Sequence, residues 1–231
     1  KKWYEMQYAT LGPYAANSLF NCNPTIREGN ILDITNIKYH DSLKDFPTRI
    51  TYARVWDLGH KDKKGSKKAQ KSDPTGGTLL GFRKIGMNTE LKIPIVELWV
   101  KDYKEFMEKS PKRDRMITDT IYTDGPEVEC VMESTADSMD AVNQLITKLK
   151  AVKIIRKINV TKSKTIRIAP MEAVFAIGNV HILKAGWNDR WIEGIQEFDG
   201  SDSVHDEMVD NISTGYEYLV WKGRMPRSVR W

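Results

Sequence analysis

The sequence predicts an α/β fold in which helices flank a mixed β-sheet, with an antiparallel three-strand meander on one side and parallel crossover strands on the other. Two patterns predict this class. Three runs rich in β-branched and aromatic residues follow one another with short links, and segments of helical and strand periodicity then alternate. The composition is that of a folded chain, because 40% of the 231 residues are hydrophobic and 7 Trp, 9 Tyr and 6 Phe are present.

The meander is expected over residues 49–58, 78–84 and 90–100. The first strand ends near Asp57, and a turn through Gly86-Met87-Asn88 is expected to join the second strand to the third. Three consecutive strands with short links pair most simply as antiparallel neighbours.

The alternating part of the chain follows the meander. Apolar spacing predicts helices over residues 112–122, 138–150, 167–177, 188–198 and 203–219, and strands over 127–132, 152–158 and 179–183. Residues 49–220 are therefore expected to form the folded domain. Pro and Gly punctuate residues 1–48, expected to be an irregular linker segment that packs on this domain, and the basic residues 221–231 are expected to be a mobile tail.

The charged residues are segregated along the chain, although the net charge is only +5. Residues 61–71 carry six Lys against one Asp, and residues 148–167 carry eight Lys or Arg and no acid. Residues 117–140 and 191–210 each hold seven acids and no Lys or Arg. This distribution indicates basic surfaces for a polyanion and acidic clusters for cations, with solvated faces as an equally weighted alternative.

Several function classes are excluded by missing signals. No apolar run is long enough to span a membrane, and two cysteines are too few for a disulfide scaffold or a zinc cluster, which favours a reducing compartment. The glycine-rich run 76–81 is followed by Phe82-Arg83 instead of the Lys-Ser/Thr of a P-loop. No G-x-S-x-G, C-x-x-C or paired-His motif occurs.

Three acidic positions are the candidates for chemistry. Asp57 ends the first strand, and Glu133 ends the strand after the first crossover helix, so their carboxylates meet at one sheet edge if these strands are parallel neighbours. Asp206 and Asp210 are four apart at the start of the last helix, beside His205 and Glu207. Converging carboxylates repel one another, and oxygen ligands favour Mg²⁺ or Mn²⁺.

Each of these acids also has a purely structural interpretation. Asp57 can cap a turn into the lysine-rich loop, and Glu133 can be an exposed residue at a strand end. Ser203 and Asp206 have the spacing of a helix capping box, a role that is compatible with metal ligation. Only convergence of the three positions would separate the metal site from these alternatives.

The order of these motifs resembles the nuclease domain of the large terminase subunit of tailed bacteriophages and related viruses. The resemblance rests on ARVWDLG around Asp57, SDPTGG at 72–77, VECVMES around Glu133 and HDEMVD at 205–210. The segments 167–170 and 178–180, with Trp187, also resemble the stretch before the last motif. The resemblance covers about residues 49–220 and implies an RNase H-like fold.

The resemblance also implies an activity, which is metal-dependent endonuclease cleavage of concatemeric viral DNA with little sequence specificity. It implies a two-metal mechanism with Mg²⁺ or Mn²⁺ and Asp57, Glu133 and Asp206 as the metal-binding core. Glu207 and Asp210 are expected to be auxiliary ligands, and His205 to orient a ligand or water. Glu207 stands where the family has a second Asp, so which of the three helix acids is the main third ligand stays open.

The basic runs supply candidate contacts to the DNA backbone, of a kind that gives affinity without sequence choice. The candidates are Lys61, Lys63, Lys64, Lys67, Lys68, Lys153, Arg156, Lys157, Lys162, Lys164 and Arg167.

The chain begins at Lys1 without a Met, and no ATPase motif is present, so we expect it to be part of a longer protein whose N-terminal packaging ATPase domain is absent from this chain. The resemblance further implies double-stranded DNA, a portal protein and a small terminase as partners, a location in the host cell cytoplasm at the procapsid, and no membrane.

Two alternatives remain at this point. A transposase or resolvase catalytic domain of the same fold would cut with structure or end specificity. A non-catalytic DNA- or portal-binding module would bind without cutting, and its acidic residues would be solvated.

Overall fold

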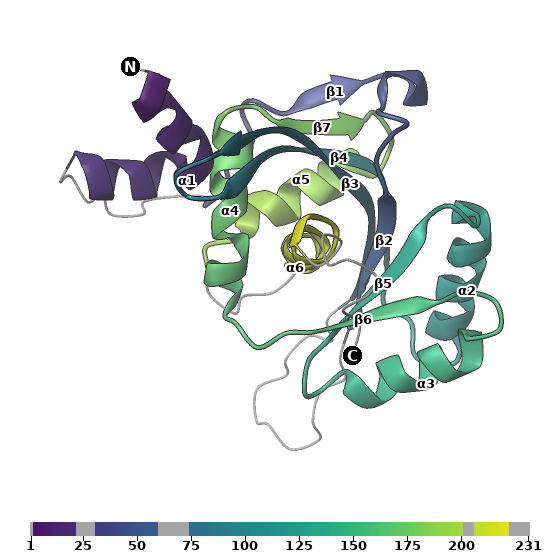
Figure 1. Ribbon diagram of the computed structural model, residues 1–231. Helices are drawn as coiled ribbons and strands as arrows, with labels where there is room; N and C mark the ends of the chain where they lie inside the picture. The colour runs from purple at the N-terminus through teal and green to yellow at the C-terminus, as the bar shows by residue number, and fades with distance from the viewer. Residues whose placement is uncertain (1, 22–30, 60–73, 201–205, 222–231) are drawn as a thin grey trace.

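A seven-stranded mixed sheet forms the centre of the molecule (Figure 1). The computed structural model describes residues 2–21, 31–59, 74–200 and 206–221. The strand order across the sheet is β1-β7-β4-β3-β2-β5-β6. The strands are β1 (Lys38–His40), β2 (Tyr52–Asp57), β3 (Thr75–Asn88), β4 (Ile93–Phe106), β5 (Glu129–Ser134), β6 (Ile155–Asn159) and β7 (Val180–Leu183).

The predicted meander is confirmed, because β2, β3 and β4 pair as antiparallel neighbours. Parallel strands extend it on both sides. β5 pairs with β2 and β6 with β5 on one side, while β7 pairs with β4 and β1 with β7 on the other. The α/β mixed sheet is therefore as expected, with the meander in its middle instead of at one side.

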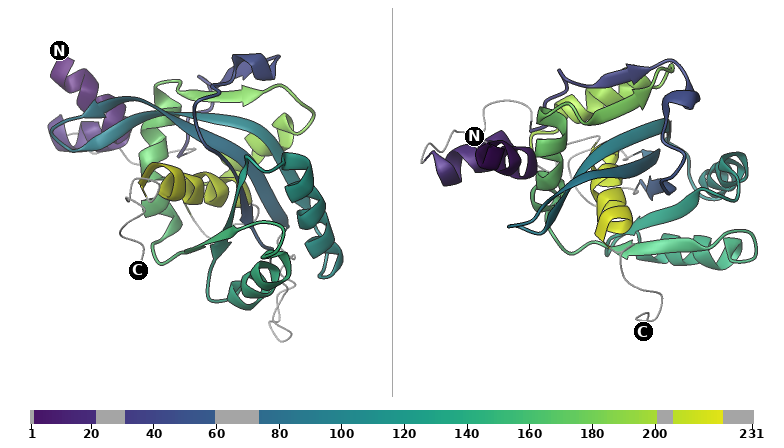
Figure 2. Two further views of the ribbon diagram at one scale, coloured as in Figure 1. Left: turned by 45° about the vertical axis from the view of Figure 1, so that its right-hand side comes forward. Right: turned by 45° about the horizontal axis from the view of Figure 1, so that its top comes forward.

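The helices cover the two faces of the sheet unequally. α4 (Lys164–Ala176), α5 (Asn188–Glu197) and α6 (Glu207–Tyr216) lie on the concave face, where α6 is yellow in Figure 1. α2 (Lys112–Asp124) and α3 (Met139–Leu149) lie on the opposite face, as the two views of Figure 2 show. Each face has its own apolar cluster, with Val55 and Leu80 in the first and Trp56 and Met132 in the second.

The alternation of side chains along β2 explains the two clusters. All five residues from Tyr52 to Trp56 are buried, and successive side chains of a strand point to opposite faces. Val55 therefore packs under α6 and Trp56 under α2 and α3. A strand covered on both faces is buried along its length, and here the buried run includes the charged Arg54.

The expectation of an irregular segment over residues 1–48 was wrong in part. Residues Lys2–Phe20 form α1, which is kinked at Gly12, where φ is 78° and Pro13 follows. A short 3₁₀ turn, η1, spans Leu43–Asp45, and β1 adds an edge strand to the sheet. Pro and Gly are typical of irregular chain, whereas here they bend one helix.

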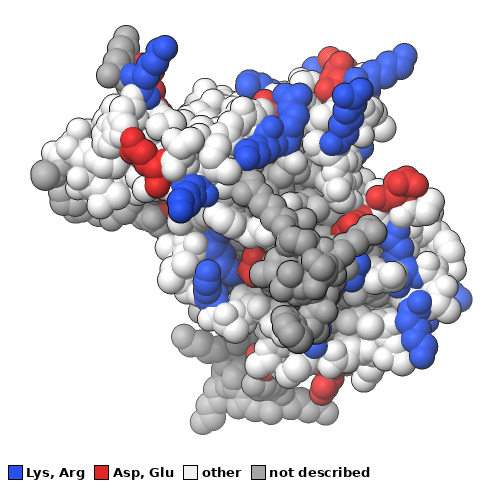
Figure 3. Space-filling model, in the orientation of Figure 1, with Lys and Arg blue, Asp and Glu red and all other residues white. Residues whose placement is uncertain are grey.

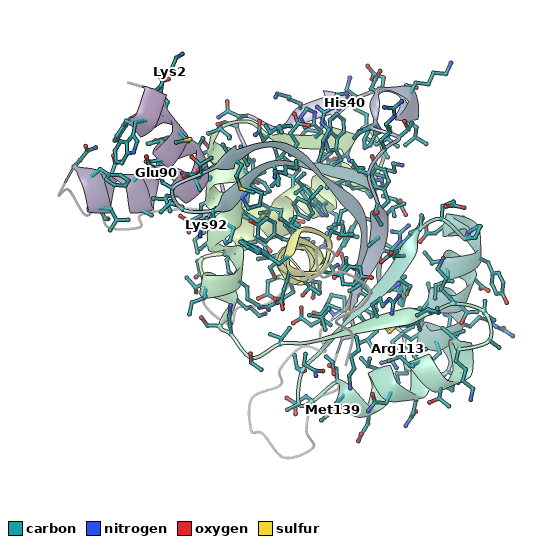
Figure 4. The ribbon with its side chains drawn as sticks, viewed as in Figure 1. Lys2, His40, Glu90, Lys92, Arg113 and Met139 are labelled. Atoms are coloured by element: carbon teal, nitrogen blue, oxygen red, sulfur yellow. The ribbon has the colours of Figure 1, made fainter. Side chains whose placement is uncertain are left out.

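α1 packs against α4 and the tip of the β3–β4 hairpin. The indole of Trp3 donates hydrogen bonds to Glu90, which is labelled beside α1 in Figure 4. Gly12 lies so close to α4 that an added Cβ would be 3.1 Å from the backbone nitrogen of Ala173. The segment thus packs on the body as expected, although the domain boundary at residue 48 stays a prediction.

Two other expected boundaries shift. The expected turn at residues 86–88 lies within β3, and the chain reverses over residues 89–92, where Asn88 Oδ1 accepts hydrogen bonds from two backbone N–H groups. The last helix begins at Glu207 and continues past Tyr216 as a π-helical turn, Glu217–Trp221. The expected positions 203–205 and 222–231 lie outside the described residues. Among the described helices, none has the length and apolar character needed to cross a membrane.

Candidate active site

Asp57 and Glu133 lie side by side at one edge of the sheet. β2 and β5 are parallel neighbours, and their register pairs Trp56 with Met132, so the next residue on each strand is one of the two acids. This is the arrangement that the sequence predicted on the condition that the strands are parallel. The side chain of Glu133 is buried, with 2% of the residue exposed.

α6 brings the remaining acids to the same edge. Asp206 is the residue before its first turn, and Glu207 and Asp210 lie in that turn. All ten residues of α6 are buried, because the helix packs between β2 and β3 on one side and α4 and α5 on the other. Its polar side chains are therefore desolvated, unlike those of a surface helix.

Glycines allow this close packing. A Cβ added at Gly76 would stand 2.6 Å from the Cβ of Glu207, and one added at Gly215 would stand 2.6 Å from a methyl group of Leu80. Distances below about 3.0 Å do not occur between such atoms, so β3 and α6 approach closely only without these side chains. The glycine-rich entry to β3, which resembles no P-loop, thus has a packing role beside the acids.

The acids line one cavity of about 360 Å³. Its lining residues include Asp57, Glu133, Asp206, Glu207 and Asp210, together with Lys162, Lys164 and Arg167. All five predicted acidic positions therefore converge, as the metal-site hypothesis requires. His205 lies outside the described residues.

Two cations from the start of α4 pair with these acids. The Arg167 guanidinium contacts Glu133 at 3.0 Å and also pairs with Asp210. Lys164 pairs with Asp206, and its Nζ lies 3.0 Å from Asp210 Oδ2. Asp210 is thus flanked by a cation at each carboxylate oxygen.

The sequence placed Lys164 and Arg167 among the DNA contacts, whereas their described partners are carboxylates. Arg167 is also buried. A basic run without acids gave no sign that two of its members turn inward, because their acidic partners are distant in the sequence.

The pKa values show that these two cations do not balance the acids. Burial, with repulsion from Asp210, raises the pKa of Glu133 to about 7. Burial raises the pKa of Glu207 to about 8. The pKa of Asp57 is raised well above its usual range by burial and by repulsion from Glu133, Asp210 and Glu207. Uncompensated negative charge in a buried site is the condition that a divalent cation relieves.

The residues fit a hard divalent ion by donor type and charge, since six Asp or Glu residues line the cavity against three Lys or Arg residues. In the structure as it stands, Glu133, Asp206 and Asp210 form ion pairs with Lys164 and Arg167. In the described part of the chain, no three His, Cys, Asp or Glu residues are placed so that they could hold an ion as they stand. Lys164 and Arg167 lie between the acids that such an ion would join.

Two hydroxyl groups of α6, not anticipated from the sequence, complete the site. Thr214 donates a hydrogen bond to Glu133 Oε2, and both Ser213 and Thr214 accept hydrogen bonds from Arg167 Nη1. Thr214 is four residues after Asp210 and eight after Asp206, so helical spacing places it on the acidic face. This spacing is the signal in the sequence from which Thr214 could have been identified.

The other predicted DNA contacts are spread more widely. Lys162 lines the acidic cavity, whereas Lys153 and Arg156 line a separate cavity of about 320 Å³ with Glu129. Lys157 donates a hydrogen bond to Asn143. Figure 3 shows Lys and Arg residues interspersed with Asp and Glu residues on the face drawn. Lys61, Lys63, Lys64, Lys67 and Lys68 lie outside the described residues, and the DNA contacts stay a prediction.

Comparison with known proteins gives likeness in structure alone. No family model and no curated protein matches the sequence. The large terminase nuclease of the thermophilic phage G20c matches with a TM-score of 0.50 and 10% identity, over 82% of this chain and 98% of that one. The fold is that of a large terminase nuclease.

Two further solved structures match less closely. The same phage nuclease with bound zinc has a TM-score of 0.48 and 12% identity, over 81% of this chain and 94% of that one. The human cytomegalovirus terminase nuclease domain, soaked in Mn, has a TM-score of 0.46 and 11% identity, over 76% of this chain and 88% of that one.

Proposed function

We propose that this chain is the metal-dependent DNA endonuclease domain of a large terminase, cutting concatemeric viral DNA with little sequence specificity during genome packaging. The observation that carries the proposal is the convergence of Asp57 and Glu133, from neighbouring strand ends, with the acids of α6 in one cavity. The terminase nuclease fold supports the same function.

The five acids are the proposed holders of Mg²⁺ or Mn²⁺, with two ions as the expected number. Divalent ions of this kind polarise a phosphoryl oxygen and lower the pKa of water, which provides a nucleophile for phosphodiester hydrolysis. Asp57 and Glu133 sit on the ends of buried strands, so their carboxylates are fixed by the sheet. Rigid placement of this kind keeps reacting groups in line.

One basic side chain of the cavity, Lys162, is proposed to hold the DNA backbone. It lines the same cavity as the acids, which supports a contact to a phosphate near the scissile one. Contacts of this type do not read sequence, which agrees with unspecific cutting. Double-stranded DNA, a packaging ATPase domain, a portal protein and a small terminase in the host cytoplasm complete the proposal.

The test is incubation of supercoiled plasmid with the chain in Mg²⁺, Mn²⁺ or EDTA. We expect nicked and linear products with either metal and none in EDTA. Asp57→Ala should reduce cleavage by about a thousandfold, because metal-ion catalysis supplies several kcal/mol of barrier lowering. Asp41→Ala is the matched control, since this exposed acid pairs with Lys184 away from the cavity, and it should cut normally.

Other outcomes would point to the alternatives. Cutting confined to branched DNA or to defined ends would indicate a transposase- or resolvase-like domain. DNA binding that is equal with metal and with EDTA, without cleavage, would indicate a binding module and contradict the proposal.

A further inference from the structure

Both terminal nitrogens of Arg167 are hydrogen-bonded in the acidic cavity, whereas its buried Nε has no hydrogen-bond partner in the described part of the chain. Its Nη1 donates hydrogen bonds to Glu133, Ser213 and Thr214 at 3.0, 3.1 and 3.2 Å. Its Nη2 donates to Glu133 Oε1 at 3.3 Å and to Asp210. The residue is 9% exposed. A guanidinium held by five contacts and closed off from solvent is a fixed part of the site.

Lys164 differs from Arg167 in each of these respects. Its side chain is 27% exposed, against 5% for the side chain of Arg167, and within the described residues it pairs with the carboxylates of Asp206 and Asp210. An ammonium group on a flexible stem leaves such a partner readily, whereas the planar fork of an arginine is preorganised for two-sided contact with carboxylates. An entering ion can therefore displace Lys164 far more easily than Arg167.

The fixed guanidinium divides the acids into two groups. Glu133 and Asp210 are each contacted by Arg167, and Glu133 also accepts a hydrogen bond from Thr214. Asp57 lines the same cavity, and no contact between it and Arg167 occurs in the described part of the chain. The positive charge of Arg167 is thus concentrated on one half of the cavity.

We propose that Arg167 is a positioning residue that takes the place of a cation in the acidic cavity, joining Glu133 to Asp210 and weakening the binding of metal ions on that side. Asp57, together with Asp206 once Lys164 has moved away from it, would then hold a metal ion more tightly than Glu133 and Asp210. This inference rests on the proposed function. It makes Arg167 a determinant of how tightly the site binds metal, in place of the DNA contact that the sequence predicted.

The experiment is titration of the intact chain with Mn²⁺ in the absence of DNA, followed by electron paramagnetic resonance of the free ion. Arg167→Gln removes the charge and keeps an amide within reach of the α6 hydroxyls. We expect Mn²⁺ to bind at least about tenfold more tightly, equivalent to about 1.4 kcal/mol, because one positive charge leaves the cavity. Thermal stability without metal should fall, and Mn²⁺ should restore more of it than in the parent chain.

Arg54→Gln is the matched control. Arg54 is a second buried arginine with two aspartate partners, on the opposite side of the sheet from the cavity. Its loss should lower stability without changing Mn²⁺ affinity. A purely structural role of Arg167 would give the same result as this control, namely lower stability with unchanged Mn²⁺ binding, and would overturn the inference.

A second variant covers a failure of Arg167→Gln to fold. Arg167→Lys keeps the charge, but a single ammonium cannot span Glu133 and Asp210 as the fork does, so Mn²⁺ should bind about threefold more tightly. Unchanged or weaker binding in this folded variant overturns the inference and leaves the nuclease proposal intact. Absence of Mn²⁺ binding in the parent chain as well contradicts both.

Discussion

Two buried arginines, on opposite sides of the sheet, show how differently the molecule uses the same side chain. Arg54 is 2% exposed and pairs with Asp102 and Asp124, while its Nη1 donates to the backbone oxygen of Gly77. Arg167 pairs with Glu133 and Asp210 in a cavity that four further acids line. Arg54 and Lys104, which lies 3.6 Å from Asp102, together balance the two aspartates, whereas the acids around Arg167 outnumber the basic residues.

The pKa values of the acids on the two sides of the sheet reflect this difference. Asp114, on the α2 side, is also buried, but hydrogen bonds from Lys148 and Arg113 overcome the effect of burial and lower its pKa. Glu133 has an arginine partner as well, yet burial and the charge of Asp210 prevail and raise its pKa. Buried ion pairs alone therefore do not mark a site. A functional site is marked instead by a buried excess of charge of one sign.

The largest expected effect on stability comes from the balanced side. Arg54→Met leaves Asp102 and Asp124 without their buried partner, so the free energy of unfolding should fall by about 3–5 kcal/mol. Urea denaturation measures this fall in the free energy of unfolding. Plasmid cleavage per folded molecule should stay unchanged, because Arg54 does not line the acidic cavity. A loss of unfolding free energy below about 1 kcal/mol would mean that the ion pairs of Arg54 do not stabilise the fold, and would contradict the contrast between Arg54 and Arg167.

A smaller effect is expected where β3 meets α6. Gly76→Ala places a methyl group against the Cβ of Glu207, and relief of this overlap should cost about 1–3 kcal/mol and move the acid. Plasmid cleavage should fall by about tenfold, measured beside thermal stability. Gly86→Ala is the matched control in the same strand, since its nearest contact, to Ile95, would be an ordinary 3.5 Å. Equal activity of both variants would rule out a positioning role for this packing.

Stability without metal should also depend on pH. The folded-state pKa values of Glu133 and Glu207, about 7 and about 8, lie above the value of 4.5 that each has when unfolded. The folded chain then binds more protons than the unfolded chain, so stability in EDTA should fall as pH rises from 4.5 to 8.

Melting temperatures in EDTA across this pH range measure the change, and Glu133→Gln should flatten the curve. The paired acid on the α2 side, Asp114, contributes a pH dependence of stability with the opposite sign. The pKa of Asp114 is lowered, so its contribution is lost as pH falls below the usual carboxyl range. A metal-free chain that gains stability between pH 4.5 and 8 would contradict the charge imbalance at the cavity.

The sequence anticipated those parts of the fold that depend on local pattern. The strands that carry Asp57 and Glu133 are recognisable from their residue types and alternation, whereas the sequence states the parallel pairing of these strands only as a condition. A helix that carries Asp206 and Asp210 is recognisable from apolar spacing, although its start is not. The sequence does not predict α1, because Pro13 and the neighbouring Gly12 are also typical of irregular chain.

What the sequence determined by itself is therefore the set of acids and the strands and helix that carry them, since periodicity and residue type are local properties. Only the tertiary structure decided which charges meet. Arg167 and Glu133 are 34 residues apart, and Arg167 and Asp210 are 43 apart. A run of basic residues looks the same whether its members face water or carboxylates. Burial of α6 on all sides makes the difference, because it withdraws water and leaves each acid dependent on the cations that packing provides.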